Sequence, residues 1–381
     1  MKRILSCIII LFTAAAQISA QDYYSSNSFS LSIMPVYENW NVLNNSVFSE
    51  ITNSVSMNYY ASRDSRISFA TKYASVGGDL NKLNGFSDSQ ISFAQSLTKY
   101  NLILRLGINL PSGKTKLTTN QYQTLKIISQ GLFGLRTPDF GQGTNFILGA
   151  TWVHQVSDNF VIGLGLSYQI KTEYQPLQEY SWKYKPANEI SVTGGFDLKF
   201  PGTQTLTGDA TGIFYGNDKM NGNEVFSSGS RTLLDLMYKK YIGYNKFSAM
   251  LFYSIVSEKY YFQNVFSDIN ILNNLTPTEI QLLYSQVDNV KLNPNRLYMR
   301  AAFDQRLTPS ISMGYGLFAS VFEKTVSFFS GYTVYGLMLT PDFKISPSVN
   351  IPLLLKYSRG SAANKPDLQN YTVGAGISLS L

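Results

Sequence analysis

The sequence predicts an all-β fold: a closed antiparallel transmembrane β-barrel of about 16 strands, with 14 as the alternative count. Three observations support this prediction. They are a hairpin with two unusually long arms, a composition with few charges and many aromatic residues, and connections that alternate between short and long. We expect residues 21–381 to form the barrel and residues 1–20 to be a cleaved signal peptide.

The first twenty residues have the anatomy of a secretory signal peptide. A basic tip at 1–3 precedes an apolar run at 4–16, and small residues lead to Ala20. The apolar run is shorter than the ~20 residues of a membrane-spanning helix, which argues against a membrane anchor. The one cysteine, Cys7, lies in this segment. The mature chain therefore offers no disulfide, thiolate metal site or cysteine nucleophile.

The composition favours a membrane barrel. Charged residues make up 14% of the chain, against about a quarter in ordinary globular proteins. Aromatic residues also reach 14%, whereas the mean hydropathy is only −0.06. Removing the signal peptide leaves 29 − 24 = +5 charges. That mild balance, with no dense Lys/Arg run, does not indicate a nucleic-acid partner.

The hairpin at 144–171 is the clearest structural signal. Each arm has one apolar face and one face of small or polar residues, because side chains alternate between the two faces of a strand. The turn is the Ser-Asp-Asn stretch at 157–159. A soluble sandwich would give the same alternation. However, arms of about twelve residues are nearer to a tilted membrane strand than to a soluble strand of about five or six.

The same alternation recurs along the chain. The apolar stripes predicted to face outward are, in order, Phe29, Leu31 and Ile33; Val55, Met57 and Tyr59; Ile67, Phe69 and Tyr73; Ile91, Phe93 and Leu97; Leu102, Leu104, Leu106 and Ile108; Ile190, Val192, Phe196 and Leu198; Leu206, Ala210 and Phe214; Leu234, Leu236 and Tyr238; Phe247, Ala249, Leu251 and Tyr253; Leu297, Met299 and Ala301; Ile311, Met313, Tyr315 and Leu317; Tyr335, Leu337 and Leu339; Ile351, Leu353 and Leu355; and Tyr371, Val373, Ala375, Ile377 and Leu379.

Connection lengths alternate, as in outer-membrane barrels, which have short turns at one end and long loops at the other. A sandwich has no reason to alternate so strictly. The short turns are predicted near 62–65, 98–101, 157–159, 201–203, 240–245, 308–310 and 346–348. The longer loops are predicted at 37–53, 77–88, 111–143, 172–187, 216–230, 257–296, 323–331 and 359–370.

Two of the long loops, 111–143 and 257–296, are candidates to constrict or plug the mouth of the barrel. The second contains a capping box, with Thr276 at the N-cap, Pro277 at the first helical position and Glu279 three residues after the cap. We expect a short helix there. The alternative is a surface loop with no role beyond shielding.

Charged residues opposite the apolar stripes are predicted to face a wet lumen, because Arg or Lys facing mid-bilayer costs about 2–4 kcal/mol. Basic residues outnumber acidic ones, which would modestly favour anions. The alternative is that these are solvated or paired charges with no selective role. The predicted lumen and selectivity residues are Lys72, Arg105, Asp197, Lys199, Asp209, Arg231, Asp235, Arg300, Asp304, Arg306, Lys344 and Lys356; Lys171 and Lys239 share their parity.

Several glycines have the same inward parity, where a missing side chain leaves room for a solute or a plug, or permits strand curvature. They are Gly107, Gly149, Gly163, Gly165, Gly195, Gly314, Gly316, Gly374 and Gly376.

The sequence offers little for catalysis. His154 is the only histidine, so a metal site with two histidines is not available. His154 falls on the apolar parity two residues before a short turn, which suits an interfacial residue better than a catalytic base. We expect no catalytic residues, no metal and no cofactor.

The mature chain resembles Gram-negative outer-membrane β-barrels. The stretch 106–114, followed by the glycine-rich stretch 141–149, is similar to segments of FadL/TodX-type and phenol-degradation-pathway transporters. The resemblance implies the outer membrane as location, with membrane lipid and the barrel-insertion machinery as partners. Too few residues follow Ala20 for a FadL-type hatch, and Leu381 stands where such barrels usually end in an aromatic residue.

Two functions follow as hypotheses. The first is a passive outer-membrane channel or transporter for a small solute, with lumen charges that tune selectivity. The second is a non-conducting barrel that serves as a structural, adhesion or secretion-complex component.

Overall fold

The computed structural model describes residues 28–42, 46–129, 131–137, 140–227, 229–257, 260–261, 294–325 and 330–381. The predicted signal peptide and the helix predicted at Thr276 lie outside these residues. Across the described residues, no helix combines the length and apolarity needed to span a membrane.

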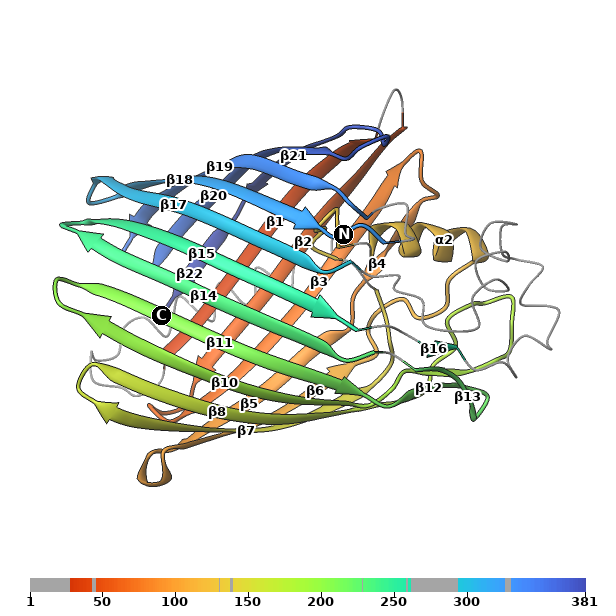
Figure 1. Cartoon of the computed structure of the whole chain (residues 1–381), viewed down its shortest axis with the longest axis horizontal. Coiled ribbons are helices and arrows are strands. Elements are labelled where there is room, and N and C mark those ends of the chain that lie inside the picture. The colour runs from red at the N-terminus through yellow and green to blue at the C-terminus, as the bar shows by residue number, and fades with distance from the viewer. Residues whose placement is uncertain are drawn as a thin grey trace.

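Sixteen antiparallel strands form a closed barrel, which confirms the predicted fold class and strand count (Figure 1). Two short strands, β4 (Leu83–Phe86) and β5 (Ser89–Leu97), both pair with β3, and we count them as one interrupted strand of the barrel. The other strands are β1 (Ser28–Val42), β2 (Ser46–Tyr60), β3 (Ser65–Gly78), β6 (Leu102–Leu110), β7 (Asn145–Ser157), β8 (Phe160–Lys171), β10 (Glu189–Phe200), β11 (Gln204–Tyr215), β14 (Arg231–Ile242), β15 (Asn245–Val256), β17 (Arg296–Thr308), β18 (Ile311–Phe322), β19 (Thr333–Ser346), β20 (Val349–Ser361), and β21 (Leu368–Ala375) with β22 (Ile377–Ser380).

The barrel closes between the first and last strands. β1 pairs with β2 on one side and with β21 and β22 on the other. Phe29 and Leu381 exchange two backbone hydrogen bonds of 2.8 Å. Closure gives both edges of the barrel sheet a partner strand, so the strand backbones of the wall bond to one another.

The two ends of the barrel differ, as the connection lengths predict. The predicted short turns all join neighbouring strands at one end, where the C-terminus also lies (Figure 1). The other end carries the helix α2 (Thr119–Ile128) and a small sheet of β9 (Tyr184–Lys185), β12 (Asn217–Met220), β13 (Asn223–Ser227) and β16 (Tyr260–Tyr261).

The prediction of a long loop at 37–53 is wrong. β1 continues to Val42 and β2 begins at Ser46, so only residues 43–45 connect them. The periodic signal fails here because the inner face changes character. Val36, Trp40 and Phe48 point inward and are buried, while polar residues such as Asn39 take outward positions. The inner face meets packed protein in this region, and the apolar-out pattern therefore disappears.

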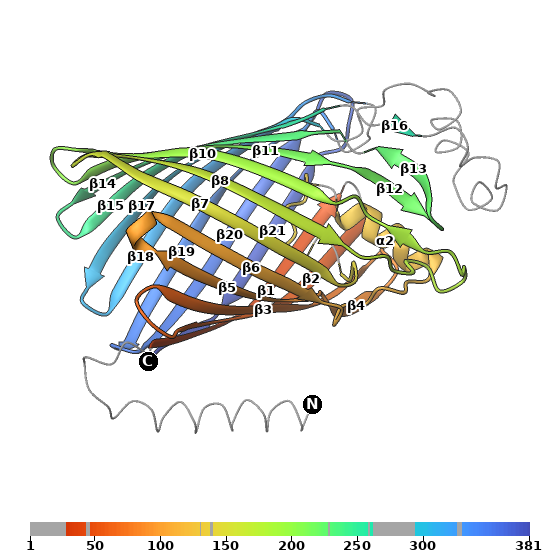
Figure 2. The same ribbon diagram turned by 90° about the horizontal axis from the view of Figure 1, so that it is seen from below.

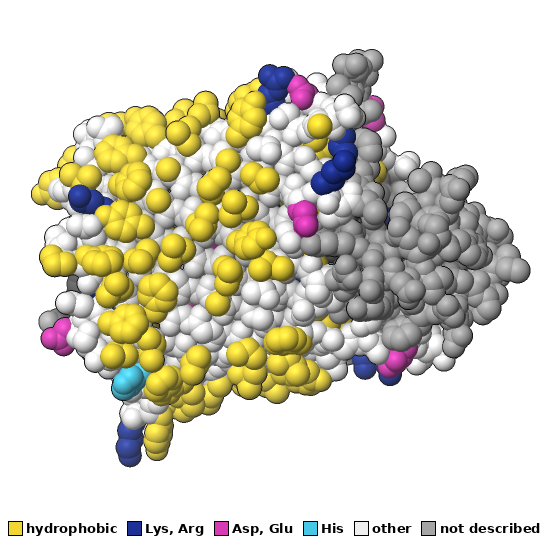
Figure 3. Space-filling model, viewed as in Figure 1, with side chains coloured by type: hydrophobic (Ala, Val, Ile, Leu, Met, Phe, Trp, Pro, Cys, Tyr) yellow, Lys and Arg dark blue, Asp and Glu magenta, His cyan; other side chains and the backbone are white. Residues whose placement is uncertain are grey.

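Along the rest of the wall the predicted alternation holds. Arg105 lies in register with Gly149, and a Cβ at Gly149 would come within 3.8 Å of the Arg105 Cβ on the inner face. Leu104 and Leu106 point the other way and are exposed on the outer surface. Figure 3 shows another part of the outer surface, over β10 to β18: apolar side chains cover its middle, and the visible charged side chains gather near the two ends. Such a band is typical of a barrel whose outside meets hydrocarbon.

Candidate functional site

The connection between β6 and β7 folds into the barrel mouth. Its helix α2 begins with a capping box: the Thr118 hydroxyl accepts from the Gln121 backbone N–H, and the Gln121 side chain accepts from the Thr118 backbone N–H. α2 lies at the end with the long connections in both ribbon views (Figure 2). Residues 131–137 follow it, and we call these seven residues the inward segment.

The inward segment is anchored by an apolar cluster. Phe133 is 1% exposed and makes edge-to-face contacts with Trp40 and Phe48, with ring centroids 5.2 Å and 4.9 Å apart. Leu132 and Leu135 join the same cluster, together with wall residues Val76, Leu83, Phe322, Val334 and Leu368. The segment therefore packs against the wall formed by β1–β3 and β18–β21.

Polar contacts fix the end of the inward segment. Glu50 Oε1 accepts from Thr52 Oγ1 at 2.6 Å and from the backbone N–H of Thr137 at 3.2 Å. Glu38 accepts from Thr372 Oγ1 at 3.3 Å and from the backbone N–H of Arg136. Lys72 Nζ donates to the Arg136 carbonyl oxygen at 2.8 Å. The wall thus holds both donor and acceptor groups of the segment's backbone.

The opposite wall, from β6 to β11, leaves space. A cavity of about 380 Å³ is lined there by Arg105, Asp197 and Asp209, and by small inward residues that include Gly149, Gly163, Gly165, Thr151, Ser167, Ser191, Thr193 and Gly195. Arg105, Asp197 and Asp209 are exposed, which means that this side of the lumen is accessible to water. The predicted inward glycines of β7, β8 and β10 widen this side.

Two further cavities lie beside the inward segment, and Arg136 lines both. One, of about 220 Å³, is bordered by Lys72, Asp88, Gln90 and Asn145. The other, of about 330 Å³, is bordered by Arg296, Arg300, Lys356 and Glu38. Sequence reasoning missed Arg136, Arg296, Glu38 and Glu50.

The structure places all the predicted lumen residues on inward-facing strand positions but does not gather them into one site. Arg105, Asp197 and Asp209 share one cavity, Arg300 and Lys356 another, and Lys72 a third. Asp235 lies beside Asp209 in the β11–β14 register. The others are dispersed: Arg231 donates to Ser254 Oγ at 3.1 Å, Asp304 pairs with Lys246 at 2.8 Å, and Lys199, Lys239, Arg306 and Lys344 lie near the turn end.

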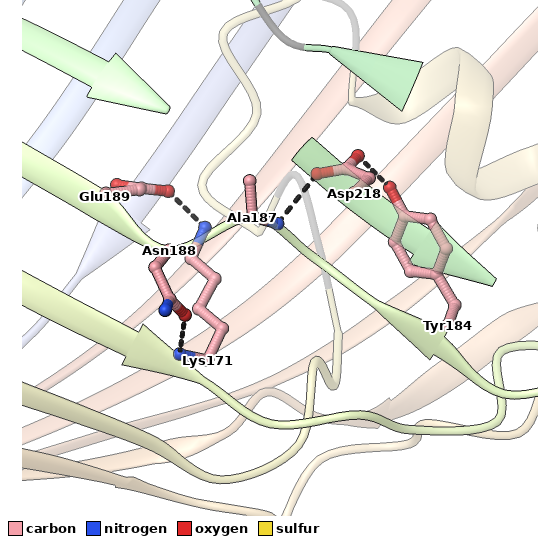
Figure 4. Close-up of polar contacts among 6 residues, drawn as sticks. All are labelled: Lys171, Tyr184, Ala187, Asn188, Glu189 and Asp218. Atoms are coloured by element: carbon pink, nitrogen blue, oxygen red, sulfur yellow. Dashed lines mark hydrogen bonds and ion pairs between the residues drawn. The ribbon is translucent and has the colours of Figure 1, made fainter. Parts of the chain in front are cut away.

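Lys171 ends β8 within a polar network at the base of the 172–188 connection (Figure 4). Its ammonium pairs with Glu189, and its backbone N–H donates to Asn188 Oδ1 at 3.0 Å. Nearby, Asp218 accepts from the Ala187 N–H at 2.7 Å and from the Tyr184 hydroxyl. Burial, followed by the Asp218 charge, raises the pKa of Tyr184 above its ordinary value. These contacts tie the connection to β12.

The described residues contain no cluster of three or more His, Cys, Asp or Glu suited to a metal ion. His154 projects from β7 on the outer surface near the turn end (Figure 3). It stacks on Trp152 with ring centroids 5.3 Å apart.

No protein-family model matches the chain, and no curated protein sequence does. Several solved barrels are similar in shape at low identity. CdiB from Acinetobacter baumannii is 11% identical with a TM-score of 0.49, over 94% of this chain and 60% of CdiB. OccAB1 from the same species is 10% identical with a TM-score of 0.47, over 95% and 98% of the two chains. The outer membrane protein OpdK from Pseudomonas aeruginosa is 9% identical with a TM-score of 0.46, over 93% and 99%. The resemblance to FadL/TodX-type transporters stays a prediction.

Proposed function

We propose that the protein is a passive channel for small solutes in the bacterial outer membrane, with a polar, mildly basic lumen. The observation that carries this proposal is the asymmetric lumen. The inward segment packs against one wall, while the facing wall is lined by glycines, short polar side chains and water-exposed charges. A lumen narrowed on one side and wet on the other suits selective diffusion.

The packed inward segment is also the observation that favours the alternative, a closed barrel with a structural, adhesion or secretion-complex role. Planar-bilayer recording of the purified full chain separates the two functions. The channel hypothesis expects steady unitary currents, whereas the closed barrel expects none at any voltage.

The ion selectivity of a channel with this lumen should change when a lumen charge is removed. Replacing Arg105, which lines the glycine-rich side, with Gln removes one positive charge from the water-accessible wall. We expect the reversal potential in a salt gradient to shift toward cation preference. Arg63→Gln is the matched control, because Arg63 lies in the exposed turn between β2 and β3, outside the strands of the wall. An unchanged reversal potential in Arg105→Gln would contradict a role for this wall in permeation.

If the barrel lies in a membrane, arginine substitutions at neighbouring residues of β8 should have very different effects on its stability. Leu166 is 57% exposed on the outer surface, whereas Ser167 lines the lumen cavity. Leu166→Arg should destabilise the barrel by about 2–4 kcal/mol, because the guanidinium would meet hydrocarbon near the middle of the strand. Ser167→Arg should change stability by less than about 1 kcal/mol, because its side chain reaches water. Urea titration of the barrel refolded into lipid vesicles measures both values. Equal losses would argue against a lipid-facing outer surface.

A further inference from the structure

The cavity of about 330 Å³ beside Arg136, lined by β1, β17–β21 and the inward segment, has an excess of positive charge. Its lining contains four cationic side chains, Arg136, Arg296, Arg300 and Lys356, and one carboxylate, Glu38. These charges leave 4 − 1 = +3 on the walls. A surplus of this size in a partly enclosed space attracts anions more strongly than the same charges would in open water.

Several polar atoms of this lining have no hydrogen-bond partner in the protein. They are the donors Arg300 Nε and Trp40 Nε1, the hydroxyl Ser358 Oγ and the acceptor Glu38 Oε2, each shielded from solvent. Trp40 and Ser358 are each 1% exposed. Indole and guanidinium N–H groups can only donate. Buried donors normally find acceptors, so these two atoms point to a ligand that brings an acceptor into the cavity.

Two of the four cationic side chains of this cavity, Arg296 and Lys356, are held in place by their neighbours. Arg296 donates from Nε to Ser320 Oγ at 2.8 Å and lies 5.4 Å and 5.3 Å from the ring centroids of Tyr298 and Phe322. Lys356 Nζ lies 5.1 Å from the centroid of Phe318. Such contacts reduce the entropy lost when an anion binds.

Apolar side chains make up a large part of the remaining lining, beside the hydroxyl groups of Tyr298, Ser320 and Thr372. Leu132 and Phe133 contribute from the inward segment, and Phe318, Met338 and Leu354 from the wall. An inorganic anion would gain nothing from these side chains, whereas burial of an apolar body is favourable at about 25 cal/mol per Å². The volume of about 330 Å³ is at the lower end of the range for small-molecule sites.

We propose that this cavity binds small amphipathic monocarboxylates, with the carboxylate between Arg300 and Lys356 and the apolar body against Phe133, Phe318 and Leu354. The inference rests on the proposed channel function for passage of the ligand through the membrane. Binding itself is independent of passage and is measured separately.

Trp40 provides a local probe. The mature chain has Trp40, Trp152 and Trp182, so a Trp152→Phe/Trp182→Phe background leaves one indole, at the cavity. Sodium benzoate is titrated into this purified full-length barrel in detergent at constant ionic strength, with Trp40 fluorescence as the readout. We expect a saturable change with benzoate, but no saturable change with benzyl alcohol, which lacks the charge, or with phosphate, which lacks the apolar body.

Variants assign the binding to the cavity. In the same background, Arg300→Gln and, separately, Lys356→Met should weaken benzoate binding about tenfold or more, because each removes a charged partner. Arg63→Gln, the matched loss of charge in the turn between β2 and β3, should leave the titration unchanged. Heat-modifiable migration on gels checks that each variant folds.

No saturable benzoate signal, or equal affinity in the parent, Arg300→Gln and Lys356→Met barrels, would overturn the proposal. Phosphate binding as tightly as benzoate would overturn it too, in favour of an inorganic anion site. A barrel that binds benzoate but carries no current would support the binding site and refute the channel. A barrel that conducts but binds no benzoate would support the channel and refute the binding site.

Discussion

Replacing residues 119–137 with a short Gly–Ser linker should raise the single-channel conductance several-fold. This change removes α2 and the inward segment, which occupy one side of the mouth and pack on Trp40 and Phe48. Current through a water-filled pore is limited by its narrowest section, and the facing wall of small side chains cannot narrow it alone. Unitary currents of the two proteins in the same salt solution measure the difference.

The matched control removes the β12–β13 hairpin, which lies at the same end of the molecule but beyond the barrel strands (Figure 1). Its loss should leave the conductance near the parent value. Heat-modifiable migration and resistance to urea show whether each shortened chain still forms a barrel. If excision of 119–137 leaves the current unchanged while the barrel remains intact, the inward segment does not set the pore width.

The barrel wall was predictable from the sequence because each strand's apolar and polar faces are set by neighbouring residues along the chain. An outer face of Leu, Ile, Phe and Tyr and an inner face of small or polar residues repeat with period two, and this pattern identified the β7–β8 hairpin and most other strands. The same parity predicted Arg105, Asp209, Arg300 and Lys356 for the inner surface, and in the strand registers of the structure these residues alternate with Leu104, Leu206, Met299 and Leu353.

The interior was not predictable in the same way. Glu38 and Glu50 keep the inward parity of charged lumen residues, but nothing in the sequence indicates their partners, which are backbone groups of Arg136 and Thr137, about ninety residues away in the chain. No periodic pattern marks the inward segment itself, since it is neither helix nor strand. One signal was present and missed: Thr118 followed by Gln121 is a capping box, and it marks the start of α2.

Glu50 should decide whether the inward segment stays in place. Its carboxylate is fully buried and accepts hydrogen bonds from Thr52 Oγ1 and from the Thr137 N–H. Glu50→Ala would leave this buried N–H without an acceptor, which costs about 1–3 kcal/mol. This cost applies only while the segment is packed against the wall, because the Thr137 N–H of a released segment would donate to water. The substitution therefore shifts the segment toward release.

The absence of thiols in the predicted mature chain makes this shift measurable. A cysteine introduced at Leu132, which is 5% exposed in the apolar cluster, should react slowly with a water-soluble maleimide. In the Glu50→Ala background the same cysteine should react about tenfold faster, since every 1.4 kcal/mol changes an equilibrium tenfold.

Glu50→Gln separates the loss of the acceptor from the loss of charge. The glutamine carbonyl still accepts from Thr137, so its labelling rate should stay close to that of the parent with the same cysteine. If Gln and Ala accelerate labelling equally, the negative charge of Glu50 near Lys72 holds the segment, rather than the hydrogen bond to Thr137. If neither substitution accelerates labelling, the packing of Phe133 against Trp40 and Phe48 is sufficient to hold the inward segment without the hydrogen bond to Glu50.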